Sequence, residues 1–309
     1  MRSHPSPPSS AGAPAETRIQ VFALGGLRVE AGGDPVADLP SQPVRCGVFL
    51  YLAVERAATR DELTALFWPE TPSERARHSL SQTLYELRRR LGPGWLEGGG
   101  ERLEVSPLVA VDAVEFSASA EAGRDEEALA LFAGPFLDGV HLAASAPFES
   151  WVQRRRAHLL RQFQGVCRRL AASRAAGGDV EGALAVARRW AEVDPLDDEA
   201  HHRLIELLAA AGRRSDALRC YHEYERRIAA ELDVQPLDET RHLAANLRGA
   251  AAIDPPPESP STAPSVSPLA ISRPAHGDRE PEVRPAAREP HRTAYLRSPA
   301  RRRTLVAAL

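Results

Sequence analysis

The stretch 75–91 carries the side chains best suited to contact another molecule. It holds five arginines against one glutamate, a net charge of +4, whereas residues 18–107 together hold 11 arginines and 12 acids. Apolar residues recur at helical spacing and predict a buried stripe, which leaves the other side chains on the opposite face. Arginine and glutamine can form paired hydrogen bonds with base edges, while serine and tyrosine suit phosphate oxygens. The predicted DNA-binding residues of this helix are Arg75, His78, Ser81, Gln82, Tyr85, Arg88 and Arg89.

These arginines also have a simpler interpretation. Every one of the 39 basic residues is arginine, and alanine is abundant, a composition typical of GC-rich coding sequence. Positive charge near a helix C-terminus also favours the helix dipole, which applies to Arg88–Arg90 whatever they contact. The net charge of −3 adds no general attraction for nucleic acid. The prediction of DNA contact therefore depends on the elements around this helix.

Three helices are predicted between residues 42 and 91. Apolar spacing places the first at about residues 42–55. The second opens with Thr59-Arg-Asp-Glu62, a capping box in which both end residues satisfy free backbone donors. We expect another capping box at Thr71-Pro-Ser-Glu74, with its proline at the first helical position, and an end at Gly92-Pro93.

Strands are predicted on both sides of these helices. Residues 19–24 and 27–30 have the pattern of short strands around a glycine turn. Residues 95–105 form a second hairpin pattern, centred on three glycines, in which Arg102 is the only cation. Strands, three helices and a hairpin in this order predict a winged helix over residues 18–110. Because such a hairpin can reach the DNA backbone or minor groove, Arg102 joins the predicted DNA-binding residues.

Residues 18–107 resemble the winged helix of OmpR-type response regulators, in the form found in antibiotic-regulatory activators of actinomycetes. The resemblance rests on motifs along this whole segment: Ile19-Gln-Val-Phe-Ala-Leu-Gly-Gly-Leu27, Arg60-Asp-Glu-Leu63, Leu66-Phe-Trp-Pro69, Glu74-Arg-Ala-Arg77 and Leu87-Arg-Arg-Arg-Leu-Gly92. The chain departs from the family at Gln42-Pro-Val-Arg-Cys46, where relatives carry a denser basic stretch. Backbone contacts from this first helix are therefore expected to be weaker.

Residues 111–250 contain a repeated motif that predicts helical hairpins. The pattern Gly-x4-Ala-Leu begins at Gly123, Gly178 and Gly212, and the last two copies are 34 residues apart, the period of tetratricopeptide (TPR) repeats. The alanine lets two helices approach closely, and the glycine permits the turn between them. The large aromatic side chains of the repeats are expected to pack inside the hairpins: Trp190, Tyr221 and Tyr224.

The order of these parts extends the resemblance. A winged helix followed by Trp151-Val-Gln-Arg-Arg-Arg156 and helical hairpins resembles regulators with a bacterial transcriptional activator domain, over about residues 18–250. The resemblance implies sequence-specific activation, with double-stranded DNA as the partner. It also implies that the TPR-like hairpins mediate homodimerisation or contact with RNA polymerase. The expected fold class is mainly α with a small β part.

No residue pattern predicts catalysis, a cofactor or a metal site. The chain has no lysine for a phosphate-binding loop, no dinucleotide fingerprint and no His-Glu-x-x-His motif. On a helix, His201 and His202 point about 100° apart and make a poor metal pair. Cys46, Cys167 and Cys220 lie far apart, and their odd number without a signal peptide indicates a reducing compartment. We therefore expect a cytoplasmic protein that is not an enzyme.

Both ends are predicted to be disordered. Residues 1–17 are rich in proline and serine, and residues 251–309 hold 11 of the 26 prolines. The final Arg301-Arg-Arg303 precedes six mostly apolar residues, as at the start of many membrane anchors. Either the sequence is truncated before an anchor, or this is an ordinary tail. No apolar run in the chain is long enough to span a membrane.

Two functions follow from these patterns. The first is a DNA-binding transcription regulator, expected to be an activator, with residues 75–91 in the major groove. The alternative is a TPR-like interaction adaptor whose winged helix no longer binds DNA. A gel-shift experiment with the DNA upstream of its own gene would separate the two.

Overall fold

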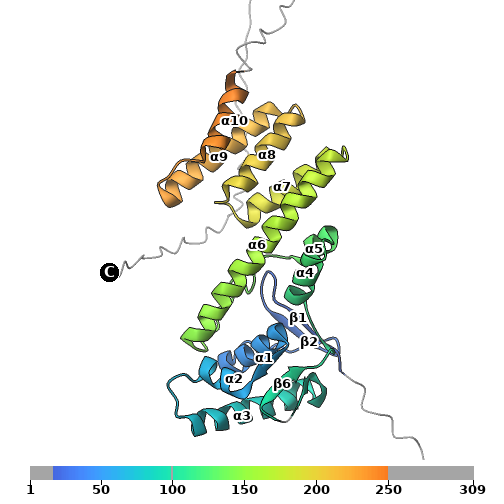
Figure 1. Ribbon diagram of the computed structural model, residues 1–309, viewed down its shortest axis with the longest axis vertical. Helices are drawn as coiled ribbons and strands as arrows, with labels where there is room; N and C mark the ends of the chain where they lie inside the picture. Colours follow the sequence, from blue (N-terminus) through green and yellow to red (C-terminus); the bar gives the residue numbers. More distant parts are fainter. Residues whose placement is uncertain (1–16, 99, 250–309) are drawn as a thin grey trace, which may run out of the picture. The chain divides into compact units, whose positions relative to one another are not determined.

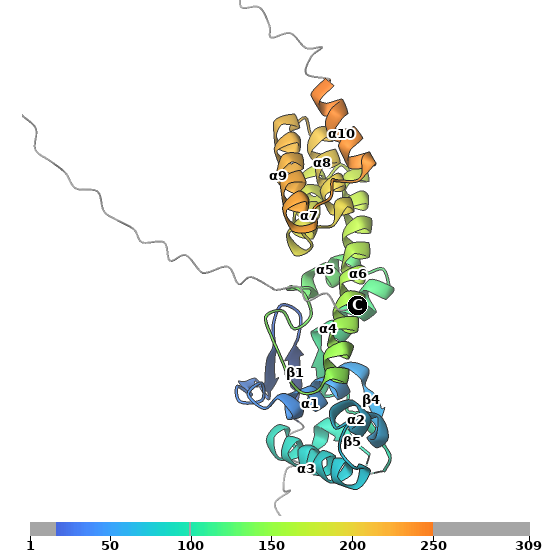
Figure 2. The same ribbon diagram turned by 90° about the vertical axis from the view of Figure 1, so that its left-hand side faces the viewer.

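The computed structural model describes residues 17–98 and 100–249 (Figures 1 and 2). Small sheets and helices come first along the chain, and helical hairpins follow, so the predicted fold class is confirmed. The predictions for the tail 251–309, and for all but the last residue of the arm 1–17, lie outside the described residues. None of the described helices combines the length and apolarity needed to cross a bilayer.

A four-stranded sheet lies at the start of the fold. Its strands are β1 (Ile19–Phe22), β2 (Arg28–Ala31), β3 (Asp34–Pro35) and β7 (Val109–Val111), in the order β3-β2-β1-β7. β1 pairs antiparallel with β2 and parallel with β7. Alternate residues point to opposite faces. Val21 and Val29 are buried on one face, whereas Gln20 and Arg28 are exposed on the other.

Three helices and a second sheet complete the winged-helix part. The helices are α1 (Pro43–Glu55), α2 (Arg60–Phe67) and α3 (Ser73–Leu91), followed by the short 3-10 helix η1 (Pro93–Trp95). The sheet has the order β4-β6-β5, with strands β4 (Ala57–Thr59), β5 (Leu96–Glu97) and β6 (Arg102–Val105). The predicted strands, three helices and hairpin are therefore confirmed in their order along the chain.

One of the two predicted capping boxes forms. The Thr59 hydroxyl accepts a hydrogen bond from the Glu62 amide at 3.1 Å, and the Glu62 carboxylate accepts one from the Thr59 amide at 2.7 Å. The predicted box at Thr71 is wrong, because Pro72 takes the cap position and no side chain caps α3. The threonine precedes the helix by one residue too many to reach its free amides. Since α3 begins at Ser73, it also includes Glu74, which lowers its net charge from +4 to +3.

Helices dominate the rest of the described chain. They are α4 (Asp112–Glu121), α5 (Asp125–Leu131), α6 (Ala146–Ala176), α7 (Val180–Val193), α8 (Asp198–Ala210), α9 (Arg214–Leu232) and α10 (Asp238–Gly249). The helical hairpins predicted over residues 111–250 do not account for residues 132–145, which connect α5 to α6 without a helix. In this connection, Phe136 forms isolated bridges with Leu24 and Gly26, so part of the segment adds to the sheet end.

The repeated motif marks the turns of three helical hairpins. Its glycines have positive φ angles of 72°, 81° and 72° and lie between α4 and α5, α6 and α7, and α8 and α9. The motif's alanines, Ala128, Ala183 and Ala217, have no exposed surface. The predicted aromatic residues are also buried in the hairpins: Trp190, Tyr221 and Tyr224.

Helix α6 belongs to both parts of the fold. Its 31 residues span about 46 Å, and Figures 1 and 2 show it running from α1 and α2 to α7. Near its start, the Trp151 indole donates to the Glu55 carboxylate at 2.6 Å, and Arg155 pairs with the same carboxylate. The Ser145 hydroxyl donates to the Leu66 carbonyl at 2.6 Å. The domain boundary predicted at residues 110–111 thus lies within one continuous buried core, and the two domains remain a prediction.

His201 is a packing residue in this structure. Its ring stacks on Tyr224 with centroids 4.1 Å apart, and its Nε2 lies 3.1 Å from the Pro195 carbonyl oxygen. Burial lowers the pKa of His201, so the neutral ring is favoured. In the described part of the chain, no group of three potential ligands gathers where a metal ion could bind.

Replacing Ala217 with leucine tests the close helix approach in the repeats. The added volume must displace neighbours of a fully buried site, and we expect a loss of about 1–3 kcal/mol in the free energy of unfolding. Urea denaturation followed by circular dichroism measures it. Ala230→Leu, at an exposed position of the same helix, is the control and should change stability by less than about 0.5 kcal/mol. Equal losses would show that Ala217 is not in a tight contact.

A second prediction concerns pH. The unfolded chain binds a proton at His201 more readily than the folded chain, because burial lowers the folded pKa. Stability should therefore fall as the pH drops below about 6.5. His201→Phe keeps a ring against Tyr224 but cannot titrate, so its stability should decline less between pH 7.5 and 5.5. Thermal unfolding across this range gives the comparison, with His158→Phe on the exposed face of α6 as control. Parallel curves for the wild type and His201→Phe would exclude His201 as the source.

Candidate nucleic-acid interface

Helix α3 has a buried face and an exposed face. Its buried side chains are Ala76, Leu80, Thr83, Leu84, Leu87 and Leu91. The predicted DNA-binding residues of α3 lie on the other side, and all are exposed except Arg88, which is half-buried. The sequence periodicity therefore places these seven side chains correctly relative to the core.

The middle of the exposed face is a continuous row. His78, Gln82, Tyr85 and Arg89 follow one another at intervals of three or four residues, and Arg75 extends the row by one turn. The row covers about 20 Å of helix. Tyr85 is 64% exposed, a high value for a large aromatic side chain in the described part of the protein. The major groove of DNA is wide enough to admit an α-helix, and the row presents side chains of the types that contact bases and phosphates.

Most arginines of α3 already have partners within the protein. Arg77 pairs with Asp61 at 2.8 Å, Arg89 pairs with Glu86 at 3.4 Å, and Arg90 pairs with Asp38. Exposed pairs of this kind contribute little, about 0–1 kcal/mol each. Phosphate oxygens can therefore compete for these guanidinium groups. Among the described residues, Arg75 has no ion-pair or hydrogen-bond partner, so its charge is available without such an exchange.

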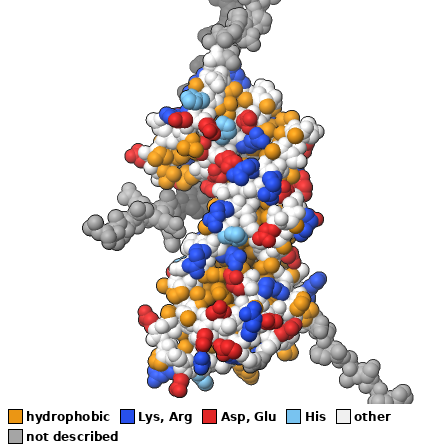
Figure 3. All heavy atoms as spheres, in the orientation of Figure 1, with side chains coloured by type: hydrophobic (Ala, Val, Ile, Leu, Met, Phe, Trp, Pro, Cys, Tyr) orange, Lys and Arg blue, Asp and Glu red, His pale blue; other side chains and the backbone are white. Residues whose placement is uncertain are grey.

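The hairpin between β5 and β6 lies next to the end of α3. Arg88 donates a hydrogen bond to the Gly98 carbonyl at 3.3 Å, so this arginine connects the helix to the hairpin. Arg102 is exposed, but its guanidinium lies 3.1 Å from the Glu104 carboxylate. Glu97 and Glu101 are also exposed on this hairpin. The hairpin is therefore acidic overall, and Figure 3 shows acidic and basic side chains intermingled at the end of the molecule where α3 lies.

Ser81 has a local partner that the sequence did not indicate. Its hydroxyl donates to the Arg77 carbonyl at 2.9 Å, one turn earlier in α3. A phosphate contact would have to use the hydroxyl as an acceptor or replace this bond. Ser81 is therefore a weaker candidate than its neighbour Gln82, which has no such bond among the described residues.

The position of α3 depends on residues that the sequence analysis did not single out. Arg56 ends α1 with a left-handed φ of 68°, and its guanidinium donates to the carbonyls of Val109 at 2.8 Å and Ser106 at 3.1 Å. It thereby joins the end of α1 to the chain after the hairpin. The ring of Trp95, which follows α3, packs edge-on against Phe49 with centroids 5.4 Å apart. Both contacts are non-local, so the spacing of residues gave no sign of them.

The comparisons with known proteins agree with this architecture. Residues 109–248 match the family model of the bacterial transcriptional activator domain. The chain is 28% identical over 262 residues to the regulatory protein AfsR of Streptomyces griseus; the match covers 77% of this chain but only 25% of AfsR. The structure of Mycobacterium tuberculosis EmbR in complex with a low-affinity phosphopeptide is also similar, with a TM-score of 0.55 and 23% identity, covering 76% of this chain and 66% of that one.

The fold and the exposed row on α3 define a winged helix joined to helical hairpins. Over residues 109–248, the chain is similar to the bacterial transcriptional activator domain family. The resemblance indicated by the sequence motifs is thereby confirmed. The chain spans about a quarter of the length of AfsR, and at 23% identity the similarity to EmbR shows the fold alone.

Arg75 offers a direct measurement of phosphate contact. Because its charge is not paired within the described structure, Arg75→Ala should weaken binding to specific and random DNA alike. The slope of log K against log salt should become shallower by about 1 unit. Fluorescence anisotropy at several salt concentrations gives the slope. Arg124→Ala, on an arginine paired with Glu127 in the helical part, is the control. An unchanged slope for Arg75→Ala would place this residue outside the contact.

Proposed function

We propose that this protein is a sequence-specific DNA-binding transcription regulator in which α3 enters the major groove. The observation that carries the proposal is the exposed row Arg75, His78, Gln82, Tyr85 and Arg89, which lies directly opposite the buried face of α3. In this proposal, Gln82 pairs with an adenine edge, and the arginines at the ends of the row contact phosphate or guanine. Such a regulator acts in the cytoplasm, where the bacterial chromosome lies.

We also propose that the helical hairpins couple DNA binding to the activation of transcription. The name of the matched family, bacterial transcriptional activator domain, supports this role for residues 109–248. The end of α9 and the turn to α10 expose Leu232, Val234 and Leu237, with 52%, 48% and 65% of their surfaces accessible. Clustered exposed apolar side chains are typical of protein contact surfaces. A second copy of the chain and RNA polymerase are the two partners proposed for this part.

The interaction adaptor remains the second candidate, because specific contacts favour it. Arg77, Arg89 and Arg90 are all paired with acids, and the hairpin beside α3 carries exposed glutamates. Acidic side chains near a DNA surface repel phosphate and lower affinity. If these effects dominate, the winged helix serves only as a folded support for the hairpins.

Selection of binding sites from random duplexes by the full chain separates the candidates. A regulator enriches a defined sequence, whereas an adaptor enriches none. With the enriched site in hand, Gln82→Ala should relax preference at one base pair, at a cost of about 1–3 kcal/mol there, with little effect on random DNA.

Glu149→Gln, at an exposed position of α6, is the control for this measurement and should leave both affinities unchanged. Equal losses on specific and random DNA for Gln82→Ala would assign Gln82 to the phosphate backbone. Failure to enrich any sequence would favour the adaptor.

A further inference from the structure

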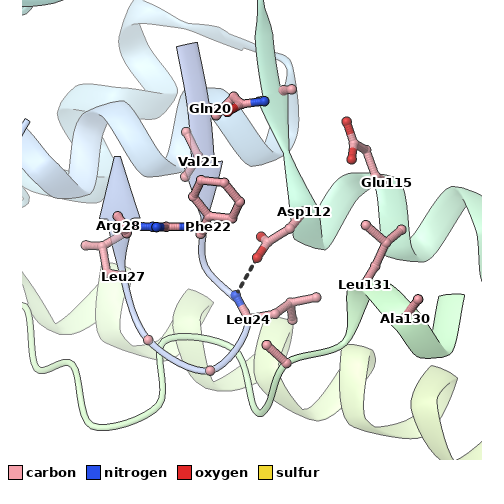
Figure 4. A pocket seen from close by; sticks show the side chains of 14 residues that line it. Gln20, Val21, Phe22, Leu24, Leu27, Arg28, Asp112, Glu115, Ala130 and Leu131 are labelled. Carbon is pink, nitrogen blue, oxygen red and sulfur yellow. Dashed lines mark hydrogen bonds between the residues drawn. The ribbon is translucent and has the colours of Figure 1, made fainter. Parts of the chain in front are cut away.

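A hollow of about 580 Å³ lies between the open face of the first sheet and the hairpin of α4 and α5. Figure 4 shows side chains from β1, β2, α4 and α5 around it. Its volume is within the range of small-molecule sites, and it lies where the winged-helix part meets the helical part. The row on α3 does not contribute to it.

The backbone around the hollow is held in place by close contacts between segments that lie far apart in the sequence. Gly25 and Gly134 approach so closely that a Cβ atom on Gly134 would lie 2.9 Å from the Gly25 Cα. The Asp112 carboxylate accepts hydrogen bonds from the amides of Ala23 at 2.8 Å and Leu24 at 3.0 Å. These contacts fix the end of β1 against α4, and both elements line the hollow.

One wall of the hollow is apolar. Phe22, Leu24 and Leu131 contribute to it, and the Phe22 ring is half-buried. The Arg28 guanidinium lies over this ring at 4.0 Å and also 3.2 Å from the Glu30 carboxylate. The charge of Arg28 is therefore already partnered by Glu30.

The other wall carries negative charge. Asp112 and Glu115 line it, and Figure 4 shows both on the α4 side, across from Phe22 and Arg28. Glu115 is exposed and has no ion-pair or hydrogen-bond partner among the described residues. Three backbone amides donate to the Asp112 carboxylate, and burial raises its pKa. With one partnered arginine and two carboxylates, the lining has a net charge of −1.

We propose that this hollow is a binding site for a small amphipathic organic cation. The apolar body of the ligand lies against Phe22, Leu24 and Leu131, and its protonated amine faces Glu115. A ligand in this position contacts the sheet end and the α4–α5 hairpin at once.

Two dyes with the same apolar body and opposite charge test the proposal. Dansylcadaverine carries an ammonium group, and dansylglycine carries a carboxylate. Titration of the full chain, followed by dansyl fluorescence, should show saturable binding of one dansylcadaverine per chain, at least about fivefold tighter than dansylglycine. Glu115→Gln should remove this preference.

Ala130→Trp should abolish binding of both dyes, because Ala130 is exposed and lines the hollow. Ala118→Trp, exposed on α4 but outside the lining, and Glu149→Gln, exposed on α6, are the controls and should bind as the wild type does. Far-UV circular dichroism checks that each variant is folded. Equal affinity for the two dyes, no saturable binding, or binding unaffected by Ala130→Trp would each overturn the proposal.

Discussion

The contact between aromatic rings of α1, α2 and α6 is the constraint on which the rest of the structure depends. Phe67 lies 5.1 Å from Phe148 and 6.4 Å from Tyr51, measured between ring centroids, and Trp151 lies 5.1 Å from Tyr51. Gly47 makes room for these rings, since a Cβ there would come within 2.7 Å of Phe67. Because α6 also packs against α7, this cluster connects α1 and α2, the helices against which α3 packs, to the helical hairpins through one long helix.

Local patterns in the sequence predicted most of the helices and strands. The structure departs from those predictions at the Thr71 box and at residues 132–145. The helices around residues 42–91 and the 34-residue repeat depend on spacing along the chain, which the sequence displays directly. The box at Thr71 failed because a shift of one residue moves the cap onto Pro72. The irregular segment 132–145 was missed because its structure comes from bridges to Leu24 and Gly26, more than 100 residues earlier.

In the candidate interface, too, the sequence predicted local features but not contacts between distant residues. Helical periodicity predicts which side chains of α3 are exposed, because that depends only on the buried stripe. It does not predict that Arg90 meets Asp38, 52 residues away, or that Arg88 bonds to the hairpin. Such pairings reduce the charge that α3 offers to any binding partner without changing the composition of the helix. Net charge read from a sequence therefore overstates the field that a binding partner meets.

Because β1 pairs with β7, the first sheet cannot be completed until β7 has been synthesised. β1 begins at Ile19, but its parallel neighbour ends at Val111, and the carboxylate that holds the end of β1 belongs to Asp112. During synthesis, the first strand leaves the ribosome about 90 residues before its partner, with one edge of its amides and carbonyls unpaired. Contacts so distant in sequence close slowly. The nascent winged helix is therefore exposed to strand-edge association until the start of α4 has been made.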